Sequence, residues 1–378
     1  MYDREDERKI CLDLIKQRSH FRLHGPRRVG KTTVLKMIKD EISSDVVLFN
    51  CQTGYDSPQS IINGLAQACG IPERHHDIAN SDNWMESGDT LINTIRKDRT
   101  GIIVIIDEFS TVLSRMDNKD NTLSTIFLDW FVKHLDSRDE IIFIIAGSIS
   151  FETVIDGYAY SRQLKKAFPC VYVNPFDKLI AKGFIISILK EKGIEISGEM
   201  VDMLHESIVV AMGENGLFPV FIREFTEHII DQGLENVCNA KYETDDDMKA
   251  KISNFIAGVY SKVLEDIVKQ ISKGTNQTFP LILDYFNAML DDVKRVIPNY
   301  ETSNKRYEIA ELFQSGVQKR QIGLVEARLM GSDTLEILDS LVKIYVTRKD
   351  ENCYYFDLKF LYDIWIKLYP SVELGRIR

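Results

Sequence analysis

The sequence predicts an α/β protein with a mostly parallel sheet, followed by an all-helical region and a C-terminal winged-helix domain. Three observations lead to this prediction. Strand and helix patterns alternate from residue 20 to about 176, and helical patterns alone continue to about 296. The last part then shows three short helices, a strand–turn–strand and a final helix. Alternating strands and helices indicate a parallel sheet covered by helices on both faces.

The first region holds five expected strands, and one of them is central. Gly101 to Asp107 is an uninterrupted run of apolar residues that ends in a carboxylate, which is typical of a strand buried on both faces. We expect strands near 20–24, 46–51, 102–107, 141–147 and 170–173. We expect helices within 1–19 and near 31–42, 57–69, 82–96 and 121–135.

The remaining chain divides into a helical part and a mixed part. Helices are expected near 178–192, 197–212, 217–232, 246–272 and 279–296, with Pro280 in the first turn of the last. The mixed part has expected helices near 308–313, 322–329, 334–342 and 358–369, and expected strands at 343–349 and 353–356. Three helices followed by a hairpin predict a winged helix, a variant of the helix-turn-helix.

Residues 25–32 read Gly-Pro-Arg-Arg-Val-Gly-Lys-Thr, a complete G-x-x-x-x-G-K-[ST] phosphate-binding loop. Its glycines allow a tight turn that aims backbone N–H groups at phosphate oxygens. Lys31 would reach the β- and γ-phosphates, and the Thr32 hydroxyl would bind Mg²⁺. A glycine-rich turn without a ligand is the alternative, but a random chain of this length shows the pattern only about one time in a hundred. The expected nucleotide contacts are Gly25, Pro26, Arg27, Arg28, Val29, Gly30, Lys31, Thr32 and Thr33.

Two carboxylates end the central strand, where ligands bind in open α/β sheets. Asp107 fits the Mg²⁺-associated carboxylate of a Walker B motif, with Thr32 as the second metal contact. Glu108 points differently and suits a general base that polarises the attacking water. The alternative is that both residues only cap the strand. A further strand ends at Ser148, which either senses the γ-phosphate or is an ordinary strand-to-turn serine.

The composition of the chain argues against a membrane protein and against a secreted protein with disulfides. The 378 residues are 44% hydrophobic, so they can form real cores in two or three domains. The longest apolar runs are about eight residues, too short to cross a membrane, and the charged N-terminus lacks the apolar stretch of a signal peptide. Six scattered cysteines without a C-x-x-C pair favour reduced thiols, so we expect a cytoplasmic protein.

Charge argues against a protein that coats nucleic acid. The formal net charge is −10, and residues 271–378 carry 15 Lys or Arg against 15 Asp or Glu. The C-terminal domain is therefore neutral and could contact phosphates only through a local patch.

These motifs together resemble a known family: prokaryotic AAA+-like P-loop NTPases related to the STAND clade, the archaeal-type ATPase family. The matching segments are Asp3-Arg4-Glu5, the loop and its following threonine, Ile-Ile-Asp-Glu-Phe at 105–109, Ala-Gly-Ser-Ile-Ser at 146–150, Pro175-Phe176 and the winged helix. The resemblance implies ATP and Mg²⁺ as ligands. It also implies a nucleotide-binding domain at 1–176, a helical lid and connector at 177–300, and a winged helix at 301–378.

The resemblance suggests three softer site features. Residues 216–219, Gly-Leu-Phe-Pro, are similar to the Gly-x-Pro signature of the lid but have one extra residue. Arg223 is the nearest candidate for a second sensor. Arg162 stands just before the last strand, where related ATPases place an arginine finger that acts across a subunit boundary. It could equally be a solvated charge or a salt-bridge partner, so the self-association that a finger requires stays open.

Three functions are compatible with the sequence. The leading one is a Mg²⁺-dependent ATPase whose hydrolysis drives a conformational switch. The second is an ATPase that docks on duplex DNA through its winged helix. The third is a non-hydrolysing, nucleotide-gated adaptor for an effector protein in signalling or defence.

The charges of the winged helix bear on the second function. Its third helix carries Asp333, Glu336 and Asp339 against a single Lys343. The wing has Arg348 and Lys349, but Asp350 and Glu351 follow at once. Carboxylates that face DNA phosphates weaken binding, so these residues favour an intramolecular role or docking to protein over docking to DNA.

Overall fold

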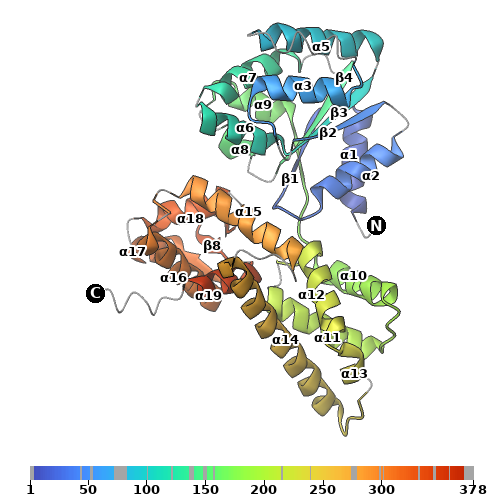
Figure 1. Ribbon diagram of the computed structural model, residues 1–378, viewed down its shortest axis with the longest axis vertical. Helices are drawn as coiled ribbons and strands as arrows, with labels where there is room; N and C mark the ends of the chain where they lie inside the picture. Colours follow the sequence, from blue (N-terminus) through green and yellow to red (C-terminus); the bar gives the residue numbers. More distant parts are fainter. Residues whose placement is uncertain are drawn as a thin grey trace. The chain divides into compact units, whose positions relative to one another are not determined.

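The computed structural model describes most of the chain. The described residues are 4–42, 45–51, 54–71, 83–99, 101–120, 122–135, 140–147, 151–155, 158–213, 216–238, 240–273, 279–297, 299–300, 302–330, 333–343, 346–356 and 358–369. They divide into two compact units, of which the first ends at Asn174 and the second begins at Pro175. Figure 1 labels the elements of both units.

The first unit is built on a five-stranded parallel sheet with the strand order β2-β3-β4-β1-β5. The strands are β1 (Phe21–His24), β2 (Val46–Asn50), β3 (Ile102–Asp107), β4 (Ile141–Ala146) and β5 (Cys170–Tyr172). All five predicted strands are confirmed. Every residue of β3 and β4 is buried, as expected for central strands covered on both faces. Because the strands are parallel, their carboxyl ends share one edge of the sheet.

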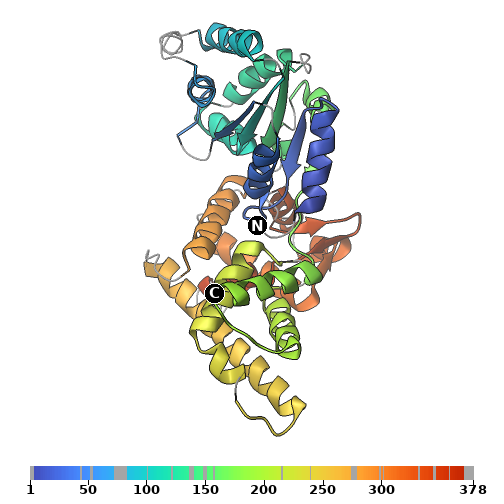
Figure 2. The same ribbon diagram turned by 90° about the vertical axis from the view of Figure 1, so that its right-hand side faces the viewer.

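Helices cover both faces of this sheet (Figures 1 and 2). They are α1 (Glu5–Lys16), α2 (Lys31–Glu41), α3 (Pro58–Ala68), α5 (Trp84–Asp98), α6 (Phe109–Lys119), α7 (Leu123–Lys133), α8 (Phe151–Val154) and α9 (Ser161–Ala167). Ile102, Val104 and Ile106 on one face of β3 join a buried cluster with α3, α5, α6 and α7. Helices α1 and α2 pack against each other on the opposite face. Helices α6, α8 and α9 are additional to those predicted from the sequence.

The second unit begins with helices only, which confirms the predicted all-helical region. These helices are α10 (Lys178–Glu191), α11 (Gly198–Met212), α12 (Pro219–Asp231), α13 (Leu234–Cys238), α14 (Asp245–Lys273) and α15 (Pro280–Val296). Proline occupies the first turn of α12 and α15, where its missing N–H costs no helical hydrogen bond. The side chains of Asp177 and Ser197 accept hydrogen bonds from the first turns of α10 and α11.

The chain then forms a winged helix, as predicted. Its elements are α16 (Ser303–Lys319), β6 (Gln321–Gly323), α17 (Leu324–Met330), α18 (Thr334–Lys343), β7 (Arg348–Lys349), β8 (Cys353–Tyr355) and α19 (Lys359–Leu368). The three strands are antiparallel in the order β6-β8-β7. Phe313, Tyr354, Tyr362 and Trp365 fill the core of this domain.

Three details of the winged helix differ from the prediction. The helix expected at 308–313 is part of the much longer α16, which begins at residue 303. The helix expected at 322–329 is preceded by strand β6, because Ile322 pairs with Tyr354 across the small sheet. Of the strand expected at 343–349, Arg348 and Lys349 form β7, whereas Lys343 is the last residue of α18.

No helix among the described residues has both the length and the apolar character needed to cross a membrane.

Candidate functional site

The turn between β1 and α2 depends on two glycines. Gly25 has φ +148° and Gly30 has φ +107°, values that side-chain-bearing residues rarely adopt. A Cβ atom at Gly25 would also lie only 2.3 Å from the carbonyl oxygen of Val173. The loop therefore accepts no larger residue at Gly25 without moving. Arg28 has φ +59°, so a third residue of this loop also adopts a left-handed backbone.

Lys31 opens α2 and lies inside this loop. Its side chain is buried, and its Nζ donates hydrogen bonds to the carbonyl oxygens of Gly25 (2.8 Å) and Pro26 (2.7 Å). Burial lowers the Lys31 pKa to about 8, although the nearby carboxylates of Glu108 and Asp107 oppose this shift. The Lys31 ammonium is therefore hydrogen-bonded only to neutral carbonyl oxygens among the described groups. Phosphate oxygens could replace these carbonyl oxygens as its partners.

A hydrogen bond joins the two sequence motifs. Thr32 Oγ1 donates to Asp107 Oδ2 at 2.7 Å, although β4 lies between β1 and β3 in the sheet. Asp107 is only 1% exposed, and burial raises its carboxyl pKa. A hydroxyl and a carboxylate oxygen are the ligands that Mg²⁺ prefers, and a bound cation would keep Asp107 ionised. The residues present therefore fit a magnesium ion.

Glu108 has an unusual backbone and a fixed side chain. Its φ of +62° places it in the left-handed region, which costs a non-glycine residue about 1 kcal/mol or more. Its N–H donates to Asp107 Oδ1 at 3.0 Å. Its Oε2 accepts a hydrogen bond of 2.5 Å from the Thr111 hydroxyl, one turn along α6. The two neighbouring carboxylates therefore have different hydrogen-bond donors: Thr32 and the Glu108 N–H donate to Asp107, and Thr111 donates to Glu108.

A buried arginine outside the predicted site, Arg4, supports the phosphate loop. Arg4 caps α1 and is 6% exposed. Its Nη2 donates to the carbonyl oxygen of Val29 at 2.6 Å, and its Nη1 bonds to Glu7 at 2.7 Å. The one signal in the sequence is that Arg4 lies in the segment Asp3-Arg4-Glu5, which resembles the family, but that segment does not reveal the contact.

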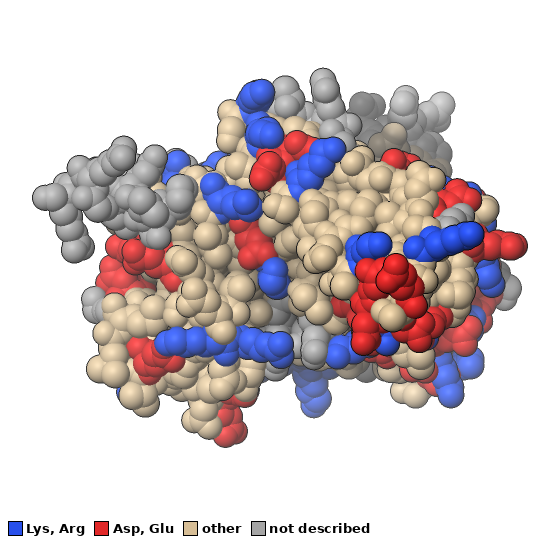
Figure 3. All heavy atoms as spheres, turned by 90° about the horizontal axis from the view of Figure 1, so that it is seen from below, with Lys and Arg blue, Asp and Glu red and all other residues tan. Residues whose placement is uncertain are grey.

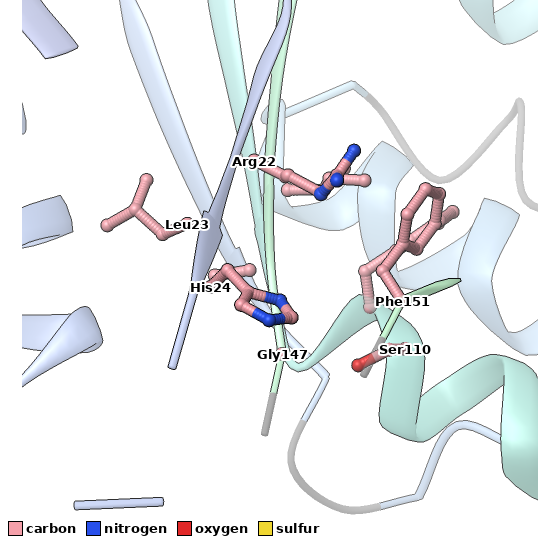
Figure 4. Close-up of a pocket in the computed structure, with 9 residues that line it drawn as sticks. Arg22, Leu23, His24, Ser110, Gly147 and Phe151 are labelled. Carbon is pink, nitrogen blue, oxygen red and sulfur yellow. The ribbon is translucent and has the colours of Figure 1, made fainter. Parts of the chain in front are cut away.

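A small cavity of ≈ 10 Å³ lies beside these groups, between the ends of β1 and β4 and the starts of α6 and α8. Figure 4 shows Arg22, His24, Ser110 and Phe151 around it. A Cβ atom on Gly147 would lie 1.9 Å from Ser110 Oγ, so the end of β4 closely approaches α6. The cavity can hold about one water molecule but no nucleotide.

The three remaining predicted site residues are Ser148, Arg162 and Arg223. Ser148 is outside the described residues, and β4 ends at Ala146 just before it. Arg162 is exposed on α9, the helix that precedes β5. Arg223 forms ion pairs with Glu191 (2.9 Å) and Glu227 (3.4 Å) on its own unit. Arg223 is thus engaged within the helical region.

The wing of the winged helix carries a neutralised cation. Lys349 Nζ bonds to Asp339 of α18 at 2.7 Å and lies 4.9 Å from the centre of the Tyr354 ring. The Tyr354 hydroxyl donates to the same carboxylate at 2.7 Å. A cation that is paired in this way offers little attraction to a DNA phosphate.

With this geometry in place, comparison with known proteins assigns the family. A family described as an ATPase domain predominantly from Archaea matches residues 1–215. The chain belongs to this family of P-loop ATPases. A search among curated proteins found no match.

Solved structures are similar over nearly the whole chain. The Walker-type ATPase PABY2304 of Pyrococcus abyssi is 15% identical with a TM-score of 0.58, and the match covers 97% of this chain and 96% of that chain. The ORC2 protein of Aeropyrum pernix, solved as ADPNP–ADP complexes, is 10% identical with a TM-score of 0.54 and coverages of 99% and 93%. At such low identities the likeness shows the fold alone. It confirms an AAA+-like P-loop sheet, a helical region and a winged helix.

Proposed function

We propose that this ATPase-family protein binds ATP with Mg²⁺ and hydrolyses it to drive a conformational switch. The observation that supports this most directly is the 2.7 Å hydrogen bond between Thr32 Oγ1 and Asp107 Oδ2. It brings one oxygen from each motif to a single point at the carboxyl edge of the sheet. Thr32 and Asp107 would hold the metal ion, which would neutralise phosphate charge.

The proposed roles of the other residues follow from their positions. The loop of residues 25–33 would bind phosphate oxygens through its backbone N–H groups, which Pro26 alone lacks. Lys31 would exchange its hydrogen bonds to the loop carbonyl oxygens for contacts with the β- and γ-phosphates. Glu108 would orient the attacking water and accept its proton. Ser148 and Arg162 remain proposals as γ-phosphate sensor and arginine finger. We propose the same three segments as before: nucleotide domain 1–176, lid and connector 177–300, and winged helix 301–378.

Replacing Glu108 separates a hydrolysing switch from an adaptor that only binds nucleotide. We expect Glu108→Gln to keep the MgATP dissociation constant within about threefold, because the proposed phosphate and metal contacts remain. Turnover should fall by at least ~100-fold, the usual effect of removing a general base. The measurements are calorimetric binding and steady-state phosphate release.

The matched control is Glu140→Gln, which removes a carboxylate that pairs with Arg96 at 3.0 Å elsewhere in the same unit. This variant should keep normal turnover. If Glu108→Gln turns over ATP like the parent, the assigned base is wrong. If the parent binds MgATP but does not hydrolyse it, the protein is a nucleotide-gated adaptor and not an ATPase.

Among the described residues of the winged helix, no observation favours DNA as the target of the switch. Lys349 is paired with Asp339, and α18 carries further carboxylates at Glu336 and Asp333. On the face drawn in Figure 3, Lys and Arg side chains are interspersed with Asp and Glu. We therefore propose a protein partner for this domain, and turnover measured with and without duplex DNA tests that preference.

A further inference from the structure

The winged helix contains a groove that the proposed ATPase does not use. It has a volume of ≈ 270 Å³ and lies between α16, the end of α17 and the start of α18. Leu312, Thr334 and Ile337 line it together with Met330. A second hollow of ≈ 130 Å³ shares Asp333 and Ile337 with the groove. The two hollows therefore adjoin along the first turns of α18.

The rim of this groove is acidic. Glu308, Glu311 and Asp333 line the larger hollow, and Asp333 and Glu336 line the smaller one. Among the described residues that line the two hollows, Lys305 is the one cation, and it bonds to Glu308 at 2.8 Å and to Asp333 at 3.4 Å. Glu311 and Glu336 are exposed and form no ion pair with any described residue. Four carboxylates thus face one ammonium group, which leaves a local excess of negative charge.

Exposed apolar side chains gather on the helix that borders the groove. Among the described residues, ten large hydrophobic side chains are exposed, and three of them lie on the seven-residue α17. Val325 (72% exposed) and Leu329 (84%) are four residues apart and share a face, and Met330 (43%) lines the groove itself. The other seven are single residues on other elements. Concentrated exposed apolar surface with a polar rim marks an interaction site.

We propose that this groove and the apolar face of α17 bind a basic amphipathic helix of a partner protein. Apolar side chains on one face of such a helix would cover Met330 and Leu329 and enter the groove. Lysine or arginine residues beside that face would pair with Glu311 and Glu336, whose charges have no partner of their own. Charge complementarity of this kind selects the partner and speeds its association. DNA is the wrong partner for the same surface, because its phosphates would meet these carboxylates.

The probe for this proposal is a synthetic helical peptide of about 18 residues, or five turns, with leucine along one face and lysine elsewhere. Its fluorescence anisotropy is measured with the full chain. A peptide of the same composition in scrambled order is measured alongside. We expect the scrambled peptide to bind at least about tenfold more weakly, because it has the same charge but no continuous apolar face.

Two variants of the chain locate the binding surface. Glu311→Lys combined with Glu336→Lys reverses the unpaired charges, and Leu329→Ser combined with Met330→Ser removes exposed apolar groups. Each should weaken peptide binding by at least about tenfold without loss of helical signal, because the changed side chains are exposed. The matched controls are Glu235→Lys combined with Glu265→Lys, and Val210→Ser, which alter exposed residues on α13, α14 and α11. Both controls should bind like the parent.

Several results would overturn the proposal. Equal binding of the ordered and scrambled peptides, or equal losses in groove and control variants, would mean that only bulk charge attracts the probe. Binding of labelled duplex DNA by the parent chain, measured without peptide and lost in the Leu329→Ser, Met330→Ser variant, would assign the surface to DNA. Peptide binding that appears only after deletion of residues 370–378 would assign the groove to the chain's own segment, which includes Arg376 and Arg378. None of these results depends on ATP, so they do not decide the proposed function.

Discussion

At the scale of single residues, the site is held together by groups that share hydrogen-bond partners. Thr32 and the Glu108 amide both donate to Asp107, and the Thr111 hydroxyl donates to Glu108. Lys31 donates to two carbonyl oxygens of its own loop. The side chains of Lys31, Thr32, Asp107 and Glu108 are therefore all hydrogen-bonded without a ligand. Binding of a nucleotide must exchange these bonds for phosphate and metal contacts.

The lowered pKa of Lys31 leads to a prediction about proton uptake. In the ligand-free protein this pKa is about 8, and phosphates beside the ammonium would raise it again. ATP binding should then take up about half a proton at pH 8 and close to one proton about one pH unit higher. Since the bound state has the higher pKa, ATP affinity should fall as pH rises above 8. Calorimetry in buffers of different ionisation enthalpy measures the uptake.

Lys31→Arg provides the control for this measurement, because a guanidinium stays charged throughout this pH range. Its ATP binding should take up no proton near pH 8. An equal uptake in both proteins would show that another group titrates.

At the scale of elements, α1 supports the phosphate loop rather than only covering the sheet. Its capping residue Arg4 is buried and bonds to the Val29 carbonyl oxygen, whereas Arg8 on the same helix pairs with Glu41 near the surface. The side chain of Arg8 is 32% exposed and that of Glu41 is 42% exposed. The two arginines therefore belong to one helix but lie in different surroundings, which makes them a matched pair.

We expect Arg4→Met to lower the free energy of unfolding by ~1–3 kcal/mol, because a buried charged hydrogen bond is lost and the Val29 carbonyl oxygen loses a donor. Nucleotide affinity should fall with it, because the loop loses that support. Arg8→Met should change stability by less than ~1 kcal/mol, as for other exposed ion pairs. Denaturant unfolding and ATP binding of both variants test this difference. Equal effects of the two substitutions would mean that Arg4 supports only the helix.

At the scale of the whole molecule, the proposed switch requires a signal that leaves the first unit. The nucleotide site is made by residues of the unit that ends at Asn174, and the winged helix belongs to the other unit. Residues 173–177 connect β5 to α10, and the Phe176 N–H in this connection donates to the carbonyl oxygen of Leu217, which lies just before α12. A change at the phosphate loop must therefore alter the exchange behaviour of helices beyond Pro175 if the switch exists.

We expect MgATP to slow amide hydrogen exchange in α10, α11 or α12 by at least about tenfold, or ~1.4 kcal/mol. MgADP should produce a smaller effect, and Lys31→Ala should abolish both. Hydrogen exchange followed by mass spectrometry measures each unit separately. Protection confined to the first unit would leave ATP binding intact but would rule out a switch that reaches the helical region.

The sequence alone determined much of this protein. The phosphate loop, the two carboxylates after the central strand, the five strands and the winged helix were all predictable, because each depends on neighbours along the chain. Helix α6 could also have been predicted from the sequence, because its apolar residues repeat at helical spacing. These residues, all buried in the structure, are Phe109, Val112, Leu113 and Met116. The short strand β6 was not predicted, because its three-residue pairing with β8 competes with a helical pattern.

Only the tertiary structure decided which distant residues meet. Three contacts are examples, between residues 25, 75 and 10 positions apart in the chain: Arg4 with Val29, Thr32 with Asp107, and Lys349 with Asp339. The acidic groove and the exposed face of α17 likewise arise from three helices that pack together. Sequence patterns report local conformation and burial, whereas such contacts depend on how parallel strands and packed helices bring their ends together in space.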